Sequence, residues 1–178
     1  MGAAHGPQGG RAVRATARGR MMEWPTTMTD KLEAQALVQR TARLLDQEDL
    51  DGWLALFEAD GVYEIASYSP ELRLPQSWWR SDAAGLGKIL AEVPQHVRDP
   101  ARRRRVVGAG VVEIEDGRAR VESPFAVYRT TPEGETSLYV VGRYEDMLAR
   151  AADGAWRYRT HRAVLDTRVL DAFTHLPL

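Results

Sequence analysis

The sequence predicts an α+β fold in which helices pack on a strongly curved, mostly antiparallel sheet. In the second half of the chain, four long runs alternate apolar and polar residues, and in the first half apolar residues recur at helical spacing. The connections between the four runs are too short for a crossover helix, so consecutive strands must be antiparallel neighbours. The four expected strands are residues 105–115, 118–130, 136–148 and 156–166.

Turn-forming residues stand between these strands. Asp116-Gly117 between two alternating runs is a strong hairpin signal. Residues 131–134 and 152–154 each combine Gly with Pro or Asp, which favours turns. The four strands therefore form a meander, and we expect the segments before it to cover one face of the sheet.

The first ordered element is expected to be a helix that starts at Thr29 and Asp30. Asp30 with Glu33 three residues later favours a helix N-terminus with a capping box. The apolar residues that follow have the spacing of one helix face. They are Leu32, Ala36, Leu37, Thr41, Leu44 and Leu45.

Shorter elements are expected between this helix and the meander. They are a short helix around Trp53 that ends near Gly61, a strand over residues 62–66, an irregular loop over residues 67–80, and a helix between Ser81 and Pro94. The apolar face of that last helix comprises Leu86, Ile89, Leu90 and Val93.

Composition limits the class of protein. A chain of 178 residues with 44% hydrophobic residues is long enough for one domain with a real core. Its formal charge of −1 gives no reason to expect a nucleic-acid or acidic-membrane partner, and no apolar run is long enough to span a membrane. The absence of cysteine excludes disulfides, cysteine nucleophiles and iron–sulfur ligation by this chain, and it is compatible with a cytoplasmic protein.

Residues 1–20 differ in character from the rest of the chain. They contain four arginines, no acidic residue, and no helical periodicity. We expect residues 1–28 to be a disordered extension, or an overcalled start with Met21, Met22 or Met28 as the first residue, and residues 29–178 to form a single domain. A basic arm that binds a partner is the alternative.

The order helix, helix, strand, helix and four antiparallel strands resembles a known architecture. It is similar to the cystatin-like cone shared by nuclear transport factor 2, ketosteroid isomerase and scytalone dehydratase. In that fold a strongly twisted sheet curls around the long first helix and encloses a pocket.

Four segments resemble the small (β) subunits of aromatic-ring-hydroxylating, Rieske-type dioxygenases. Residues 49–63 (DLDGWLALFEADGVY) resemble their second helix and first strand, and residues 139–146 (YVVGRYED) resemble their third long strand. Residues 156–170 resemble their last strand and tail, and residues 176–178 (LPL) their apolar end. The resemblance covers residues 29–178.

This resemblance implies an assembly. In that family the small subunit is noncatalytic and packs with a large α subunit in a three-plus-three hexamer. The large subunit holds the Rieske iron–sulfur cluster and the mononuclear iron, so no cofactor is expected in this chain. The compact loop between Tyr68 and Ser81 is more similar to the small subunits of anthranilate- and salicylate-type oxygenases, or of methanesulfonate monooxygenase, than to the naphthalene type. The substrate, aromatic acid or alkanesulfonate, stays open.

The histidines do not predict a metal site. A two-histidine-one-carboxylate iron site needs two convergent His, and the four available residues have no ligand-pair spacing: His5, His96, His161 and His175. His161, among arginines on its strand, is expected to be exposed or to face another subunit.

A stand-alone isomerase or dehydratase of the cone fold is the alternative function. Such enzymes place an acid, a His or a Tyr inside the cone to move protons. The pocket candidates are His96, Tyr63 and Asp49, although Asp49 also suits a helix cap and Tyr63 an ordinary strand aromatic.

The remaining candidates predict contacts with other subunits. Aromatic residues are favoured interface anchors, and the third long strand is apolar on both faces, which predicts self-association as a trimer through an outward face. We assign Val140 and Tyr144 to that outward face. The interface candidates are Trp78, Trp79, Arg102, Arg103, Val140, Arg143, Tyr144, Arg157 and Arg159, with Arg162 beside the last two.

Overall fold

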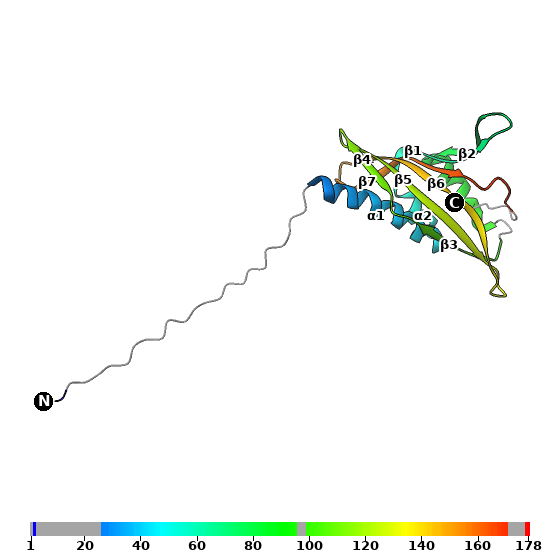
Figure 1. Ribbon diagram of the computed structural model, residues 1–178, viewed down its shortest axis with the longest axis horizontal. Helices are drawn as coiled ribbons and strands as arrows, with labels where there is room; N and C mark the ends of the chain where they lie inside the picture. Colours follow the sequence, from blue (N-terminus) through cyan, green and yellow to red (C-terminus); the bar gives the residue numbers. More distant parts are fainter. Residues whose placement is uncertain (1, 3–25, 96–98, 171–176) are drawn as a thin grey trace.

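The computed structural model describes residues 2, 26–95, 99–170 and 177–178. Within these residues the elements follow in the order α1 (Thr26–Asp46), α2 (Leu50–Leu54), β1 (Phe57–Ser69), β2 (Leu74–Asp82), α3 (Ala83–Glu92), the 3-10 turn η1 (Val93–Gln95), β3 (Arg102–Val107), β4 (Val111–Glu115), β5 (Arg118–Thr130), β6 (Thr136–Arg150) and β7 (Trp156–Leu165) (Figure 1). The strands form one sheet in the order β2-β1-β7-β6-β5-β3, and β4 also pairs with β5.

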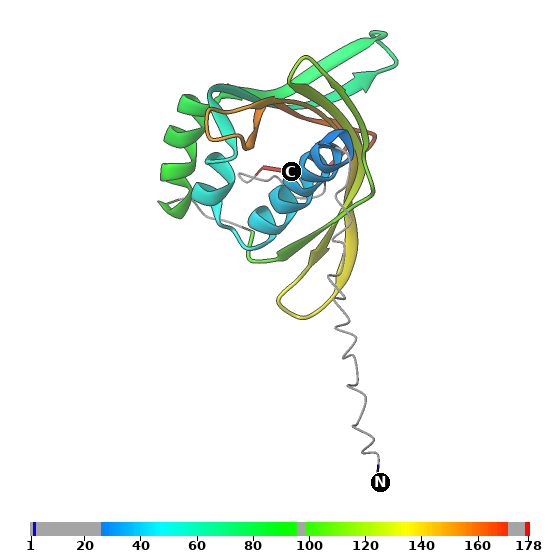
Figure 2. The ribbon, with the colours of Figure 1, turned by 90° about the vertical axis from the view of Figure 1, so that its left-hand side faces the viewer.

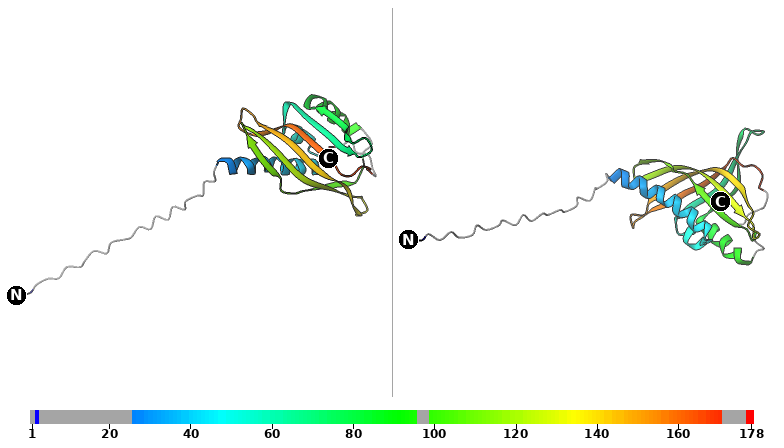
Figure 3. Two further views of the ribbon diagram at one scale, coloured as in Figure 1. Left: turned by 45° about the horizontal axis from the view of Figure 1, so that its top comes forward. Right: turned by 60° about the horizontal axis from the view of Figure 1, so that its bottom comes forward.

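The sheet curls around α1 and forms a cone. Figure 2 shows α1 inside the curve of the sheet, with α2 and α3 on the open side, and Figure 3 shows α1 crossing the concave face. The buried side chains of α1, α2 and the concave face of the strands meet in a single hydrophobic cluster. This is the α+β cone that the sequence predicts.

The predicted meander is confirmed. β5 pairs with β4, β6 pairs with β5, and β7 pairs with β6, all antiparallel. Asp116 and Gly117 both have positive φ (47° and 72°), which is the conformation of the tight hairpin turn that Asp-Gly favours. The turns before β6 and β7 carry Gly134 and Gly154, also at positive φ.

The first strand of the meander is interrupted, contrary to the prediction of one strand over residues 105–115. It divides into β3 and β4 around Gly108–Gly110. The Gly110 carbonyl accepts a hydrogen bond from Gln35 Nε2 at 2.6 Å, and the Gly108 N–H donates to the Pro124 carbonyl at 2.9 Å. The break therefore ties the sheet to α1 at the point where the sheet bends.

The start of the first helix was also predicted wrongly. α1 begins at Thr26, so its first turn includes the last residues of the expected extension, and residues 3–25 lie outside the described part of the chain. Asp30 and Glu33 do not form a capping box. Both side chains instead form ion pairs with Arg150 at the end of β6.

The segments before the meander do more than cover the sheet. β1 runs from Phe57, earlier than predicted, and pairs in parallel with β7. Residues 74–80 of the expected loop over residues 67–80 belong to β2, an edge strand that pairs antiparallel with β1, and residues 67–69 belong to β1. α3 has its predicted place, with Asp82 capping its first turn, but Ile89 is 40% exposed and does not share the buried face of Leu86 and Leu90.

Candidate functional site inside the cone

His161 and Asp146 form a buried pair on the concave face of the sheet. They stand opposite each other on β7 and β6, and His161 Nδ1 lies 2.6 Å from Asp146 Oδ1. Both side chains are fully buried. The prediction that His161 is exposed or faces another subunit is therefore wrong.

A break in strand register explains the error. Tyr158 pairs with Leu148 and Thr160 pairs with Met147, so Arg159 is an extra residue on β7. The inward positions of β7 change there from Trp156 and Tyr158 to His161 and Ala163. A strict period of two cannot show such a bulge.

Aromatic rings surround the pair on the inside of the cone. Ring centroids within 6.5 Å of the His161 ring belong to Tyr158, Tyr144, Tyr63, Phe57 and Trp53. We call these five residues the aromatic cage. Burial in this cage raises the pKa of the Asp146 carboxyl, against the lowering effect of His161.

The pair has the form of an oriented acid–base group. The Asp146 carboxylate fixes one ring nitrogen of His161, while Nε2 is buried without a hydrogen-bond partner among the described residues. A histidine held in this way can accept or donate a proton at its free nitrogen. Burial raises the pKa of Tyr63 and of Tyr158, so both phenols stay protonated, and the Tyr158 hydroxyl is hydrogen bonded to Thr41 at 2.8 Å.

Two of the predicted pocket candidates, Tyr63 and Asp49, lie among the described residues and have different places. Tyr63 belongs to the aromatic cage and therefore lies inside the cone, where the alternative function places it. Asp49 is the N-cap of α2, where its carboxylate accepts from the Gly52 N–H at 2.9 Å, so the cap reading is confirmed. His96 lies outside the described residues, as do His5 and His175.

The interior of the cone also contains a buried ion pair. Arg105, with 2% of its side chain exposed, forms an ion pair with Asp46 at the end of α1, with 2.8 Å between Nη1 and Oδ1. Asp46 also accepts a hydrogen bond from the Arg105 backbone N–H. Arg102 and Arg103 were both predicted to be interface residues, but alternation along β3 turns Arg103 and Arg105 to a different face from Arg102 and Arg104. That alternation was the available signal.

Arg103 also makes its contacts within this chain. It forms an ion pair with Asp99 at 3.2 Å and its guanidinium lies 5.1 Å from the centroid of the Tyr139 ring. Asp99 also accepts two hydrogen bonds from Arg129, at 2.7 and 2.8 Å. These contacts, with the Arg129 bonds as the largest cause, lower the pKa of Asp99 to about 2. Arg102 is exposed.

Two interface candidates were assigned to the wrong face. Val140 and Tyr144 are completely buried in the core, and the Tyr144 ring stacks on Phe125 with centroids 4.1 Å apart. The two residues do share one face of β6, as predicted, but it is the concave face. The convex face of the same strand carries Val141, Arg143, Glu145 and Met147.

The arginines on the convex face pair with carboxylates of this same chain. Arg143 and Arg162 both contact Glu145, at 2.7 and 2.9 Å. Arg157 contacts Asp153 at 2.9 Å, and Arg159 contacts Glu58 at 3.7 Å while 53% of its side chain stays exposed.

The two tryptophans lie on β2 rather than in a loop. Trp79 faces inward, and its ring is 5.4 Å from that of Tyr63 in an edge-on arrangement. Trp78 is 42% exposed on the opposite face. One of the pair therefore points outward, as expected for adjacent aromatics.

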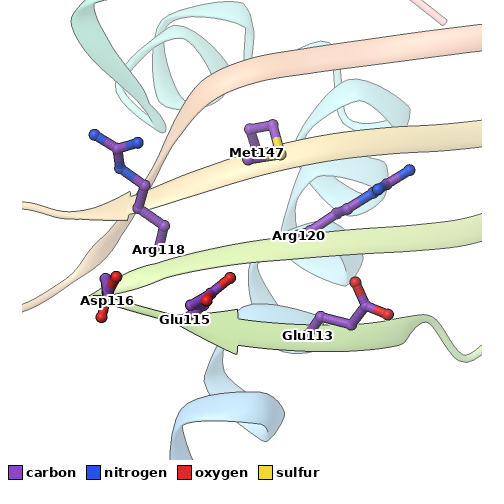
Figure 4. Close-up of a pocket in the computed structure, with 6 residues that line it drawn as sticks. All are labelled: Glu113, Glu115, Asp116, Arg118, Arg120 and Met147. Atoms are coloured by element: carbon purple, nitrogen blue, oxygen red, sulfur yellow. The ribbon is translucent and has the colours of Figure 1, made fainter.

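Figure 4 shows a hollow of about 580 Å³ over the convex side of β4, β5 and β6. Acidic side chains from β4 and its turn face basic side chains from β5, and the lining residues are Glu113, Glu115, Asp116, Arg118, Arg120 and Met147. Opposite charges on paired strands stabilise a solvated sheet face. The hollow does not bring together an acid–base group comparable to His161 and Asp146.

The sequence has no cysteine for an iron–sulfur cluster. Within the described ranges, no group of three His, Asp or Glu side chains is placed to hold a metal ion. Among the same residues, no helix is both long and apolar enough to cross a bilayer.

Comparisons with known proteins identify the family of this chain. Residues 26–162 match the SnoaL-like domain family, so the cone belongs to that family. The β subunit of 2-aminobenzenesulfonate 2,3-dioxygenase from Alcaligenes sp. is 32% identical over 84% of this chain and 99% of its own length. The chain therefore belongs to the β subunits of ring-hydroxylating oxygenases.

Two further proteins agree with this placement. The β subunit of the methanesulfonate monooxygenase hydroxylase from Methylosulfonomonas methylovora is 28% identical over 79% of this chain and 83% of its own length. A solved structure described as the β subunit of an aromatic-ring-hydroxylating dioxygenase from Novosphingobium aromaticivorans has the same fold, with a TM-score of 0.75. At 20% identity, it covers 85% of this chain and 98% of its own.

Proposed function

We propose that this chain is the noncatalytic β subunit of a Rieske-type oxygenase that hydroxylates an aromatic or small sulfonate substrate. The observation that carries the proposal is the 32% identity to an oxygenase β subunit across nearly the whole of that relative. Because this chain has no cysteine, the Rieske cluster would lie in a large α subunit. The proposal places the mononuclear iron in that same subunit. The work of this chain would be to hold those large subunits in register, in the cytoplasm.

The proposed assembly is a three-plus-three hexamer that contains a trimer of this chain. Several exposed or half-buried apolar side chains adjoin one another in the register of β3, β5 and β6 on the convex face. We call them the outer apolar patch: Val106, Ala126, Tyr128, Leu138 and Val141. Tyr128 and Leu138 stand opposite each other and are 40% and 53% exposed. This patch replaces Val140 and Tyr144 as the proposed contact between copies of the chain.

Other predicted interface residues remain part of the proposal. Trp78 lies on the edge strand β2 and is 42% exposed, Arg102 is exposed at the start of the edge strand β3, and Arg159 is exposed within β7. Aromatic and arginine side chains are the residue types most often found as anchors of protein interfaces.

Co-expression with the neighbouring oxygenase gene tests the proposal. A large subunit that carries Cys-x-His and Cys-x-x-His motifs should co-purify with a tag on this chain, and the complex should show iron–sulfur absorption. Purified alone, this chain should be colourless and free of stoichiometric iron. About one iron per isolated chain, retained after dialysis against a chelator, would contradict the proposal.

A stand-alone isomerase or dehydratase is the second candidate, and the buried pair of His161 and Asp146 is the observation that favours it. Proton transfer by that pair would need no iron. Turnover of a cyclic ketone or enol by the isolated, iron-free chain, abolished by His161→Gln, would support this candidate over the β subunit.

A further inference from the structure

The last two residues of the sequence lie inside the cone. Leu178 is completely buried, and its backbone N–H donates a hydrogen bond to the Tyr63 hydroxyl at 2.8 Å. The Pro177 carbonyl accepts one from Arg105 Nη2 at 2.7 Å. In Figure 2 the end of the chain, marked C, lies beside α1 within the outline of the cone.

The groups that hold this segment are themselves held from the other side. Arg105 is fixed by two contacts with Asp46, through its guanidinium and its backbone N–H. The Tyr63 ring packs edge-on against Trp53 and Trp79, with centroids 5.3 and 5.4 Å away. Contacts other than those with the segment therefore set the positions of the donor and the acceptor, as in a preformed binding site.

The surroundings have the character of a ligand pocket. A cavity that binds small molecules is mostly apolar and aromatic, with a few convergent polar groups. Here the aromatic cage is apolar, Arg105 offers a donor, and Tyr63 offers an acceptor. His161 Nε2 and Trp53 Nε1 are also buried, and neither has a hydrogen-bond partner among the described residues.

We propose that the cone interior is a ligand-binding site which this chain fills with its own Pro177–Leu178 segment. The ligand class follows from what the segment presents: a branched apolar group next to a carbonyl and an N–H. A short acylated peptide, or a small apolar amide of the same shape, should therefore occupy the site when the segment is removed. This inference holds whether or not the chain assembles with an oxygenase large subunit.

The occupied site also explains how a cone fold, which can enclose a catalytic pocket, can serve as a noncatalytic scaffold. The segment lies where an external molecule would approach Tyr63 and Arg105, so the intact chain excludes that molecule from the aromatic cage. Because the Pro177–Leu178 segment itself blocks the site, the residues that line the site can stay those of a binding pocket.

Removing the segment tests this directly. A chain that ends at Leu176 should bind N-acetyl-Pro-Leu saturably at one site per chain, measured by calorimetry and by tryptophan fluorescence. The full chain should not bind this dipeptide. N-acetyl-Pro-Asp is the matched control and should not bind to either chain, because its charged side chain does not fit an apolar cage.

A second variant assigns the binding to this site. Tyr63→Phe in the shortened chain keeps the ring and removes the hydroxyl that accepts the Leu178 N–H. It should weaken dipeptide binding about five- to tenfold, as expected for one hydrogen bond. Unchanged affinity, or equal binding by the full chain, would overturn the proposal because the dipeptide would then lie elsewhere.

The test stays decisive if the shortened chain does not fold. Added N-acetyl-Pro-Leu should then restore a cooperative thermal transition, because a ligand that binds the native state stabilises it by mass action. Absence of both binding and restoration, up to the solubility limit of the dipeptide, would overturn the proposal.

Discussion

Glu145 and Asp146 are adjacent residues on β6, yet they belong to two different environments. Glu145 lies on the convex face, partly exposed, where Arg143 and Arg162 both contact it. Asp146 lies on the concave face, fully buried, with His161 as its hydrogen-bond partner. Charges on the convex face are shared and screened by water, while Asp146 and His161 on the concave face are enclosed by the apolar side of the aromatic cage. The comparison predicts that equivalent substitutions on the two faces have very different consequences.

His161→Ala should have the largest effect on stability. It leaves the Asp146 carboxyl buried without its histidine, and breaking a buried pair costs about 3–5 kcal/mol. Glu145→Ala is the matched control on the convex face, and it should cost less than about 1 kcal/mol because exposed pairs contribute little. Urea denaturation of both variants measures the difference. Equal losses would mean that the two faces are energetically alike.

Leu138→Asp should disrupt self-association without unfolding the chain. Leu138 belongs to the outer apolar patch, and an introduced carboxylate would be desolvated in a contact there. Met147→Asp is the control, since Met147 is 39% exposed on the same strand but beside charged residues. Light scattering should find the Leu138→Asp protein monomeric and the Met147→Asp protein associated. A wild-type chain that is monomeric at micromolar concentration would remove the basis of this prediction.

Asp99→Asn tests an ion pair of intermediate burial, at the edge between the two faces. It should lower stability at neutral pH by about 1.5–3 kcal/mol, the range for hydrogen bonds to a charged group. The folded pKa of about 2 is below the ordinary value of 3.8. The contribution of Asp99 is therefore present above about pH 4 and is lost as the pH falls through about 2.

The pH profile makes the Asp99 prediction specific. The difference between wild type and Asp99→Asn should narrow between pH 4 and pH 2 in denaturation experiments. Asp153→Asn is the exposed control, since 58% of the Asp153 side chain is exposed beside Arg157, and its effect on stability should be much smaller than that of Asp99→Asn. A pH-independent difference at Asp99 would contradict the assignment to its carboxylate.

Deleting residues 1–20 should have the smallest effect on stability. The segment has no apolar periodicity, so its removal should leave both the melting temperature and the oligomeric state unchanged. A fall of several degrees would show that the arm packs on the domain, because about 2–4 °C is expected for each kcal/mol at this size.

Local sequence patterns made much of this fold predictable. Asp116-Gly117 predicted a hairpin turn, and the alternation of apolar and polar residues from Arg118 to Thr130 predicted β5 with its correct bounds. β2 was missed because it is an edge strand with little burial on either face, so it lacks the period of two that marks a strand.

The site was less predictable because long-range pairing creates it. The inward position of His161 depends on the bulge at Arg159, which only the pairing of β6 with β7 defines. Asp46 and Arg105 are 59 positions apart, and Leu178 meets Tyr63 across 115 positions. No periodic pattern connects residues at such separations.

Asp146→Asn in the assembled oxygenase tests the central claim most directly. The amide has nearly the size of the carboxylate and can still accept a hydrogen bond from His161, but it cannot stabilise a charged imidazole. If the cone is a scaffold, turnover per bound iron in the purified complex should equal that of the wild type. Loss of most of that turnover, with iron content and assembly intact, would contradict the account and place the chemistry inside the cone.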